Sequence, residues 1–273
     1  LERFPSLQFG LEQAIRDFSG GCERVYFESP FVHGENSIEI NGLVWMGDYD
    51  RMIERIEQKL NSGFKCIKLK IGAIDWRKEV DMIQYIRDRY DRDRVEIRVD
   101  ANGGFDMDCA IPRLKRLADL GVHSIEQPIK AGNPMLMHFL CDVSPLPIAL
   151  DEELIGKFTR EEKAATLDEI KPAYIVIKPS LTGGFSGARE WINLAEERSI
   201  GWWITSSLES NIGLNALAQW VATLHTDIPQ GLGTGGVFSN NFEAPIYLAK
   251  DRLRYDPQKK PDRKQFDSLD WRE

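Results

Sequence analysis

Three carboxylates each stand at the end of a short apolar run of the sequence. They are Asp100, Glu126 and Asp151, and they recur about every 25 to 30 residues, which is the length of one strand–helix unit. If the runs are neighbouring parallel strands, the side chains converge and repel one another. A hard divalent cation resolves that repulsion, and oxygen-only ligands favour Mg²⁺, or Mn²⁺ in its place. The alternative is that each acid is an ordinary strand-end residue satisfied by a lysine or a helix N-terminus.

Lysines end two further runs of the same kind. Lys68 and Lys70 are two residues apart, so on a strand both side chains point to one face, and Lys178 ends the run 175–178. Like charge and desolvation both lower the pKa of a lysine, which would make Lys70 a base near neutral pH. With Lys178 across a metal-bound carboxylate, this set suits removal of a proton next to a carboxylate. The alternative, two exposed lysines on an edge strand, fits poorly with the apolar residues that alternate with them.

Other polar residues after the apolar runs are candidates for substrate binding. Asn102 shares a face with Asp100 and could reach the metal or the substrate. The hydroxyls and backbone N–H groups of Ser206 and Ser207 could hold a carboxylate, or the stretch is a plain capping sequence before Asn211. A glycine-rich loop follows, and its backbone at Gly231, Leu232 and Gly233 could approach a ligand closely. It lacks the order of a phosphate-binding fingerprint, and a plain flexible loop is the alternative.

A repeated strand–helix unit accounts for the regular placement of these residues. Seven or eight such units run without a break and predict an α/β fold, a (β/α)₈ barrel over residues 37–239, whose strand ends face the active site. The first strand is expected at Ile38–Met46, and the eighth and shortest near Pro229–Leu232. Residues 1–36 are expected to lead into the barrel, and residues 240–273 to form a C-terminal segment packed outside it.

Composition excludes several classes of function. The chain has 273 residues, a net charge of −8 and a pI near 5.2, which argues against partners such as nucleic acid or an anionic membrane surface. No apolar run approaches the ~20 residues of a membrane span. The four cysteines lack any CxxC spacing and predict free buried thiols in a reducing compartment, the cytoplasm. The four histidines are scattered and read as structural or exposed. The pattern leaves a small-molecule carboxylate as the expected partner, and either a monomer or a homo-oligomer.

Taken together, these residues resemble the muconate-lactonising subgroup of the enolase superfamily, over about residues 5 to 240. The motifs that carry the resemblance are Lys68-x-Lys70, Val99–Gly103, Ile125–Pro128, Leu150–Glu152, Ile177–Pro179 and Ser206–Ser210. Within the subgroup they are most similar to the dehydratases of menaquinone biosynthesis. The resemblance implies a TIM-type barrel with an N-terminal α+β capping domain, which is largely absent from this chain.

The resemblance also implies a role for each residue. Asp100, Glu126 and Asp151 would bind Mg²⁺, with Lys68, Lys70 and Lys178 as the catalytic lysines. Lys70 would remove the proton α to the ring carboxylate of a succinyl-hydroxycyclohexadiene and return it to the leaving hydroxyl on the same face. Lys178 would steady the enediolate from the opposite face by a cation–π contact. Asn102, Ser206, Ser207 and the loop from Gly231 to Gly233 would hold the carboxylate and succinyl groups.

Related reactions share these motifs and remain open as alternatives. They are racemisation of N-acylated (N-succinyl) amino acids, epimerisation of dipeptides and cycloisomerisation. The Asp-x-Asp by which dipeptide epimerases hold an amino group is missing after the expected eighth strand, which disfavours that reaction. A barrel that binds without catalysis is a different class of function, and the complete set of lysines and acids argues against it.

Overall fold

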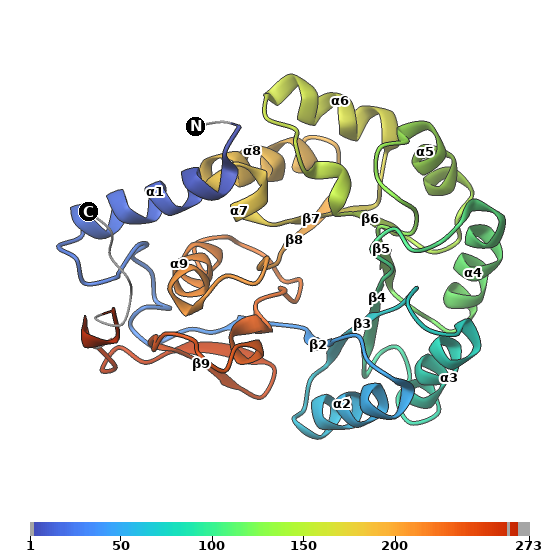
Figure 1. Cartoon of the computed structure of the whole chain (residues 1–273), viewed down its shortest axis with the longest axis horizontal. Helices are drawn as coiled ribbons and strands as arrows, with labels where there is room; N and C mark the ends of the chain where they lie inside the picture. Colours follow the sequence, from blue (N-terminus) through green and yellow to red (C-terminus); the bar gives the residue numbers. More distant parts are fainter. Residues whose placement is uncertain (1–2, 261–262, 267–273) are drawn as a thin grey trace.

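A parallel sheet of seven strands organises the molecule, with the order β2-β3-β4-β5-β6-β7-β8. The computed structural model describes residues 3–260 and 263–266. Figure 1 shows the strands as an arc with helices along its outer side. The strands are β2 (Gly42–Val44), β3 (Cys66–Lys70), β4 (Glu96–Asp100), β5 (Ser124–Glu126), β6 (Ile148–Leu150), β7 (Tyr174–Ile177) and β8 (Gly201–Ile204).

Residues 230 and 231 close the sheet into a barrel between β8 and the start of β2. Gly231 forms a parallel bridge with Thr205, and Gln230 forms one with Ile40. The Gly231 N–H donates to the Ile204 carbonyl oxygen at 2.7 Å. The predicted barrel is therefore confirmed, although its eighth position consists of isolated bridges instead of a regular strand. Pro229 lacks an N–H group and glycine weakens a strand, which explains the irregularity.

Seven helices alternate with these strands, and their starts follow ordinary capping chemistry. Asp48 accepts a hydrogen bond from the Arg51 N–H, and Thr159 forms a capping box with Glu162. The helices are α2 (Tyr49–Asn61), α3 (Trp76–Arg87), α4 (Met107–Asp119), α5 (Pro134–Val143), α6 (Arg160–Ile170), α8 (Gly184–Glu196) and α9 (Asn211–Val221).

For the later helices the sequence pattern predicts one helix from residue 183 to 198 and a second helix capped by Asn211. The first is confirmed, since α8 spans Gly184–Glu196; a separate short helix, α7 (Pro179–Thr182), precedes it, and Gly183 and Gly184 at the junction have positive φ angles, of 100° and 69°. Asn211 was expected to cap α9, but Ser210 holds the N-cap position. The Asn211 side chain instead donates to the Phe242 carbonyl oxygen at 2.7 Å.

The expected first strand is divided between two sheets. β1 (Ile38–Glu39) pairs antiparallel with β10 (Arg252–Tyr255), which pairs with β9 (Ile246–Ala249), and only β2 enters the barrel. Part of the expected C-terminal segment thus forms a hairpin beside the entry to the barrel. Residues 267–273 of that segment lie outside the described residues. The boundaries of the three expected segments stay predictions.

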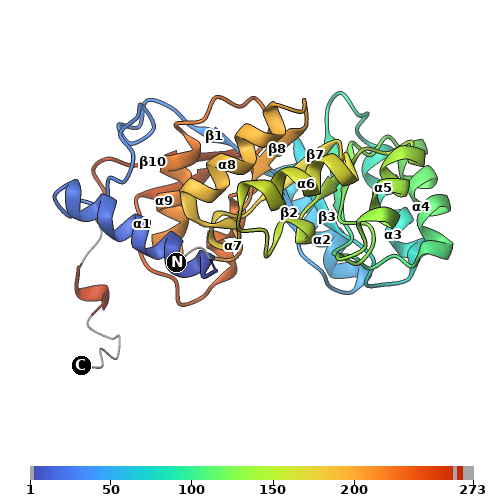
Figure 2. The same ribbon diagram turned by 90° about the horizontal axis from the view of Figure 1, so that it is seen from above.

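Helix α1 (Pro5–Ser19) lies against α7 and α8 on the outside of the barrel (Figure 2). The Phe9 ring is 5.0 Å from the Phe185 ring, centroid to centroid, and both rings are buried. No helix among the described residues is long and apolar enough to span a membrane. All four cysteines are free, as predicted, but only Cys66 is buried and Cys22 is exposed.

Candidate active site

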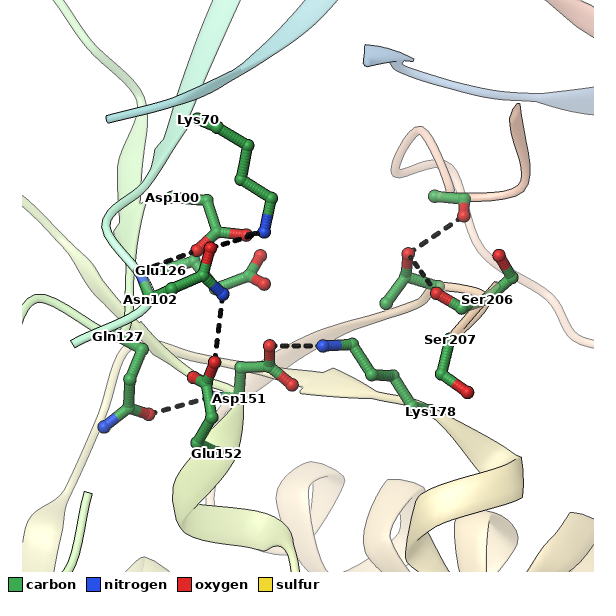
Figure 3. Close-up of polar contacts among 12 residues, drawn as sticks. Lys70, Asp100, Asn102, Glu126, Gln127, Asp151, Glu152, Lys178, Ser206 and Ser207 are labelled. Carbon is green, nitrogen blue, oxygen red and sulfur yellow. Dashed lines mark hydrogen bonds and ion pairs between the residues drawn. The ribbon is translucent and has the colours of Figure 1, made fainter. Parts of the chain in front are cut away.

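The three predicted acids meet at the carboxyl edge of the barrel because of the strand register. Asp100 is the last residue of β4 and pairs with Glu126, the last residue of β5. Asp151 follows β6 directly. All three are almost fully buried, with at most 2% of each residue exposed. Figure 3 shows their carboxylates pointing toward a common centre.

The three predicted lysines lie against these carboxylates. Lys68 Nζ is 2.9 Å from Asp100 Oδ2 and 2.5 Å from Glu126 Oε2. Lys70 Nζ is 2.6 Å from the same Asp100 oxygen, and Lys178 forms an ion pair with Asp151. The lysines thus come from opposite sides of the barrel, β3 and the end of β7, toward one acidic centre.

The lowered pKa expected for Lys70 stays a prediction, whereas the pKa of its neighbour Lys68 is shifted upward. Burial alone would lower its pKa, but the charges of Asp100 and Glu126 outweigh that effect and raise it above the ordinary value. The pKa of Lys178 is raised in the same way, because Asp151 and Glu126 outweigh its burial. For Lys68 and Lys178 the attraction of the neighbouring acids therefore decides the sign of the pKa shift.

The two carboxyls that share Lys68 respond in opposite directions. Burial would raise the pKa of Asp100, but Lys68 and Lys70 together hold it well below its usual range. Burial raises the pKa of Glu126 well above its usual value, and the charge of Asp100 raises it further. The charge of Glu126 is therefore incompletely compensated by this chain's own side chains.

The donor set fits a hard divalent cation. Glu126 Oε1 is a buried oxygen with no hydrogen-bond partner among the described residues, and such an atom calls for an ion or a ligand. Three carboxylates from neighbouring strands supply the oxygen ligands that Mg²⁺ prefers. Within residues 3–260 and 263–266, no three acidic, histidine or cysteine side chains surround a ready-made metal position, because lysine amino groups lie among these carboxylates.

Backbone and amide contacts hold the acids in place. The Asn102 N–H donates to Asp100 Oδ1 at 3.0 Å, and its side-chain amide donates to Glu152 Oε1 at 2.9 Å. The Asp151 N–H donates to Gln127 Oε1 at 3.2 Å. Asn102 also accepts from Lys70 Nζ at 2.6 Å, so it lies beside both metal and base candidates (Figure 3). Glu152 and Gln127 were not predicted as site residues. Each directly follows a predicted acid in the sequence, and that adjacency could have identified them.

A cavity of about 210 Å³ opens beside the acidic centre. It is lined by most of the predicted residues: Lys68, Lys70, Lys178, Ser206, Ser207, Gly231 and Gly233. Residues that the sequence reasoning missed also line it: Asn41, Leu43, Trp45, Thr205, Leu208 and Thr234. Leu232 is not among them. It is fully buried and faces a separate hollow, at the point where the chain turns into the 3₁₀ segment Gly233–Val237.

The serines after β8 are already engaged within the protein. The Ser207 N–H donates to Glu209 Oε2 at 2.8 Å, and its hydroxyl donates to Glu209 Oε1 at 3.0 Å. The Ser206 hydroxyl is hydrogen-bonded to the Thr234 hydroxyl. Leu208 between them has a φ of 69°. In this structure, Glu209 binds the N–H and hydroxyl of Ser207, and Thr234 binds the hydroxyl of Ser206, so the groups expected to bind a substrate carboxylate have partners within the protein.

Comparison with known proteins identifies the class to which this fold and site belong. The profile of the enolase C-terminal domain-like family matches residues 51–240. The chain belongs to this family, and the enolase-superfamily resemblance predicted from the motifs is confirmed. Enzymes of the superfamily use a divalent metal.

Comparison with individual proteins shows which members of the family this chain is similar to. The chain is 53% identical over 249 residues to an o-succinylbenzoate synthase of Desulfotalea psychrophila, covering 91% of this chain and 67% of that protein. It is 27% identical to an L-Ala-D/L-Glu epimerase of Bacillus subtilis, of which it spans only 56%. The crystal structure of MenC from Desulfotalea psychrophila superimposes with a TM-score of 0.86 at 49% identity, covering 92% of this chain and 69% of that one.

Proposed function

We propose that this chain forms the catalytic barrel of an o-succinylbenzoate synthase. The reaction is the dehydration of 2-succinyl-6-hydroxy-2,4-cyclohexadiene-1-carboxylate to o-succinylbenzoate, a step of menaquinone biosynthesis, and the enzyme is a hydro-lyase. The observation that carries the proposal is the 53% identity to a synthase of that name over most of the chain. The buried lysines and acids that line or border one cavity supply the required chemistry.

The metal in the proposal is Mg²⁺, which Mn²⁺ can replace. Asp100, Glu126 and Asp151 would hold it, and the unpartnered Glu126 oxygen supports this assignment. When bound, the cation neutralises the three carboxylates and stabilises negative charge that develops on the substrate's own carboxylate. Lys68, buried beneath the acids, positions Asp100 and Glu126 through its two ion pairs.

Lys70 is the proposed base and acid. Its amine takes the proton α to the substrate carboxylate, which breaks the C–H bond. The same proton then passes to the leaving hydroxyl, so the C–O bond breaks and water departs. Lys70 must first leave Asp100, because the two now form an ion pair of 2.6 Å; a bound Mg²⁺ would take the place of Lys70 at this carboxylate, beside Lys68. Lys178 faces the substrate from the other side and stabilises its negative charge.

A second candidate is racemisation of N-succinyl amino acids. The observation that favours it is that Lys70 and Lys178 line the cavity from different strands, which suits a reaction with one base on each face. A relative named N-succinyl-L-Arg/Lys racemase, from Bacillus cereus, is 27% identical over 76% of this chain. Exchange of the α-hydrogen with solvent deuterium in N-succinyl amino acids tests this candidate.

The main test mixes the full-length protein with Mg²⁺ and the cyclohexadiene substrate and measures the absorbance of the aromatic product. Lys70→Ala should reduce turnover by about 10³-fold or more, since general acid–base groups contribute 10²–10⁴-fold each. Lys65→Ala is the matched control, because Lys65 precedes the same strand and is exposed. A wild-type protein that binds Mg²⁺ yet forms no aromatic product would exclude the synthase activity.

A further inference from the structure

Asn41 carries a side-chain amide that makes no hydrogen bond to the part of the chain that the structure describes. Only 3% of the residue is exposed. Its backbone N–H donates to the Gln230 carbonyl oxygen at 3.0 Å, but its side chain makes no hydrogen bond within residues 3–260 and 263–266. The residue lines the cavity beside the acidic centre. Its amide atoms are not among the fully buried unpaired atoms of the described residues, so they remain accessible from this cavity and are free to bind a ligand there.

Asn41 lies on the wall opposite the acids. It immediately precedes β2 and is joined to the Gln230–Gly231 closure, whereas the acids end β4 and β5 and follow β6, on the other side of the ring. The cationic side chains that line the cavity are the three lysines, and all of them contact the acids. The wall around Asn41 is therefore uncharged.

The other polar groups on this wall have partners already. The Thr205 hydroxyl donates to the Gly231 carbonyl oxygen at 2.9 Å, and the hydroxyls of Ser206 and Thr234 bind each other. Asn41 thus offers the unused hydrogen-bonding capacity of this wall. Leu43 and Trp45 line the cavity further along the same strand face and give it an apolar side.

We infer that Asn41 determines specificity by binding the end of the substrate remote from the metal. The ligand class is a molecule with a carboxylate at one end, an apolar middle and a hydrogen-bond-accepting oxygen at the other. The Asn41 amide donates to that distal oxygen while Leu43 and Trp45 contact the middle. This inference rests on the proposed function, in which the distal oxygen belongs to the succinyl side chain.

The experiment compares a ligand that has the side chain with one that lacks it. Full-length protein loaded with Mg²⁺ is titrated with o-succinylbenzoate and with benzoate, and binding is read from the shift in melting temperature. Asn41→Leu keeps the branched shape of the side chain, with somewhat greater bulk, but removes the amide. The variant should bind o-succinylbenzoate about 10- to 100-fold more weakly, which is the contribution of a hydrogen bond to a charged or carbonyl oxygen. Its affinity for benzoate should change less than about twofold. KM should rise more than kcat falls.

Two further variants keep the test decisive. Asn61→Leu, at the exposed end of α2, is the control and should change neither ligand. Asn41→Asp preserves the shape and folds even if the leucine variant does not, and its charge should weaken o-succinylbenzoate at least as much. Unliganded Asn41→Leu should melt close to wild type, because the Asn41 side chain makes no hydrogen bond within the described residues that the change could remove.

Equal weakening of both ligands, or no weakening of o-succinylbenzoate, would overturn the inference. A lower melting temperature of the unliganded leucine variant, with ligand binding unchanged, would assign Asn41 a structural role instead. Failure of the proposed function can be told apart from failure of this inference. If the function is wrong, the wild type forms no product, but the melting-temperature shifts still show whether Asn41 contributes to the binding of each ligand.

Discussion

The two walls of the active-site cavity are built on different principles. The wall of β4, β5 and β6 carries three buried carboxylates in strand register, and each is held by lysines at the strand ends. The wall between β8 and β2 consists of isolated bridges, glycines and neutral side chains. Ion pairs between side chains hold the first wall together, whereas close contacts between backbone segments hold the second. In a family that shares one metal-assisted step, the second wall is where substrates can differ.

The largest expected effect concerns the charged wall. Glu126→Gln keeps the shape but removes one metal ligand, so Mg²⁺ affinity measured by calorimetry and turnover should both fall by about 10³-fold or more. In the metal-free protein the same change should leave the melting temperature equal or higher, because burial and Asp100 disfavour the charge of Glu126. Unchanged Mg²⁺ affinity would remove Glu126 from the site.

Replacing Lys68 tests whether the buried carboxylates of the charged wall need the positive charge of this lysine for the protein to be stable. Lys68→Met leaves Asp100 and Glu126 without the amino group between them, and breaking such a buried pair costs about 3–5 kcal/mol of unfolding free energy. Denaturant titration measures this, and saturating Mg²⁺ should restore part of the loss. Lys65→Met, at an exposed position, should cost less than about 0.5 kcal/mol. Equal losses for the two lysines would contradict the proposed positioning role of Lys68.

The uncharged wall between β8 and β2 should be most sensitive to added side-chain bulk, which would crowd the backbone there. A Cβ atom on Gly231 would lie 2.3 Å from Thr205 Oγ1, so Gly231→Ala must push the barrel closure apart. Such overpacking costs about 1–3 kcal/mol, and KM should rise while Mg²⁺ affinity stays unchanged. Gly236→Ala is the matched control in the same loop, since no atom lies within 4 Å of the added Cβ. A fall in Mg²⁺ affinity would show that the two walls are not independent.

The smallest effect should come from Glu209, which fixes the loop after β8. Glu209→Gln weakens the hydrogen bonds to Ser207 and to the Ser180 hydroxyl. We expect a loss of about 1 kcal/mol in transition-state binding, or fivefold in kcat/KM, because one charge-assisted hydrogen bond becomes neutral. Steady-state kinetics measure it, and a loss of more than a hundredfold would make Glu209 part of the chemistry.

The same contrast explains what could be predicted from the sequence. The positions of Asp100, Glu126 and Lys178 followed from regular strand ends, because the strand period fixes both their level and their direction. Leu232 was assigned to the cavity wrongly and Asn41 was missed, since both belong to irregular backbone whose register no periodicity reveals. The run Ile38–Met46 concealed a change of sheet, because an alternating pattern suits either sheet. The raised pKa of Lys68 depends on distances between strands that the sequence does not contain.

The bridge between Ile40 and Gln230 also sets a constraint on how the molecule forms. These residues lie near the two ends of the barrel sequence, so the ring cannot close until nearly the whole chain has left the ribosome. Contacts so distant in sequence form late and slowly. The wall that carries Asn41 is therefore the last to take shape during synthesis. A nascent chain holds its charged half as an open arc with an unpaired β2 edge, which is the stage at which a chaperone would recognise it.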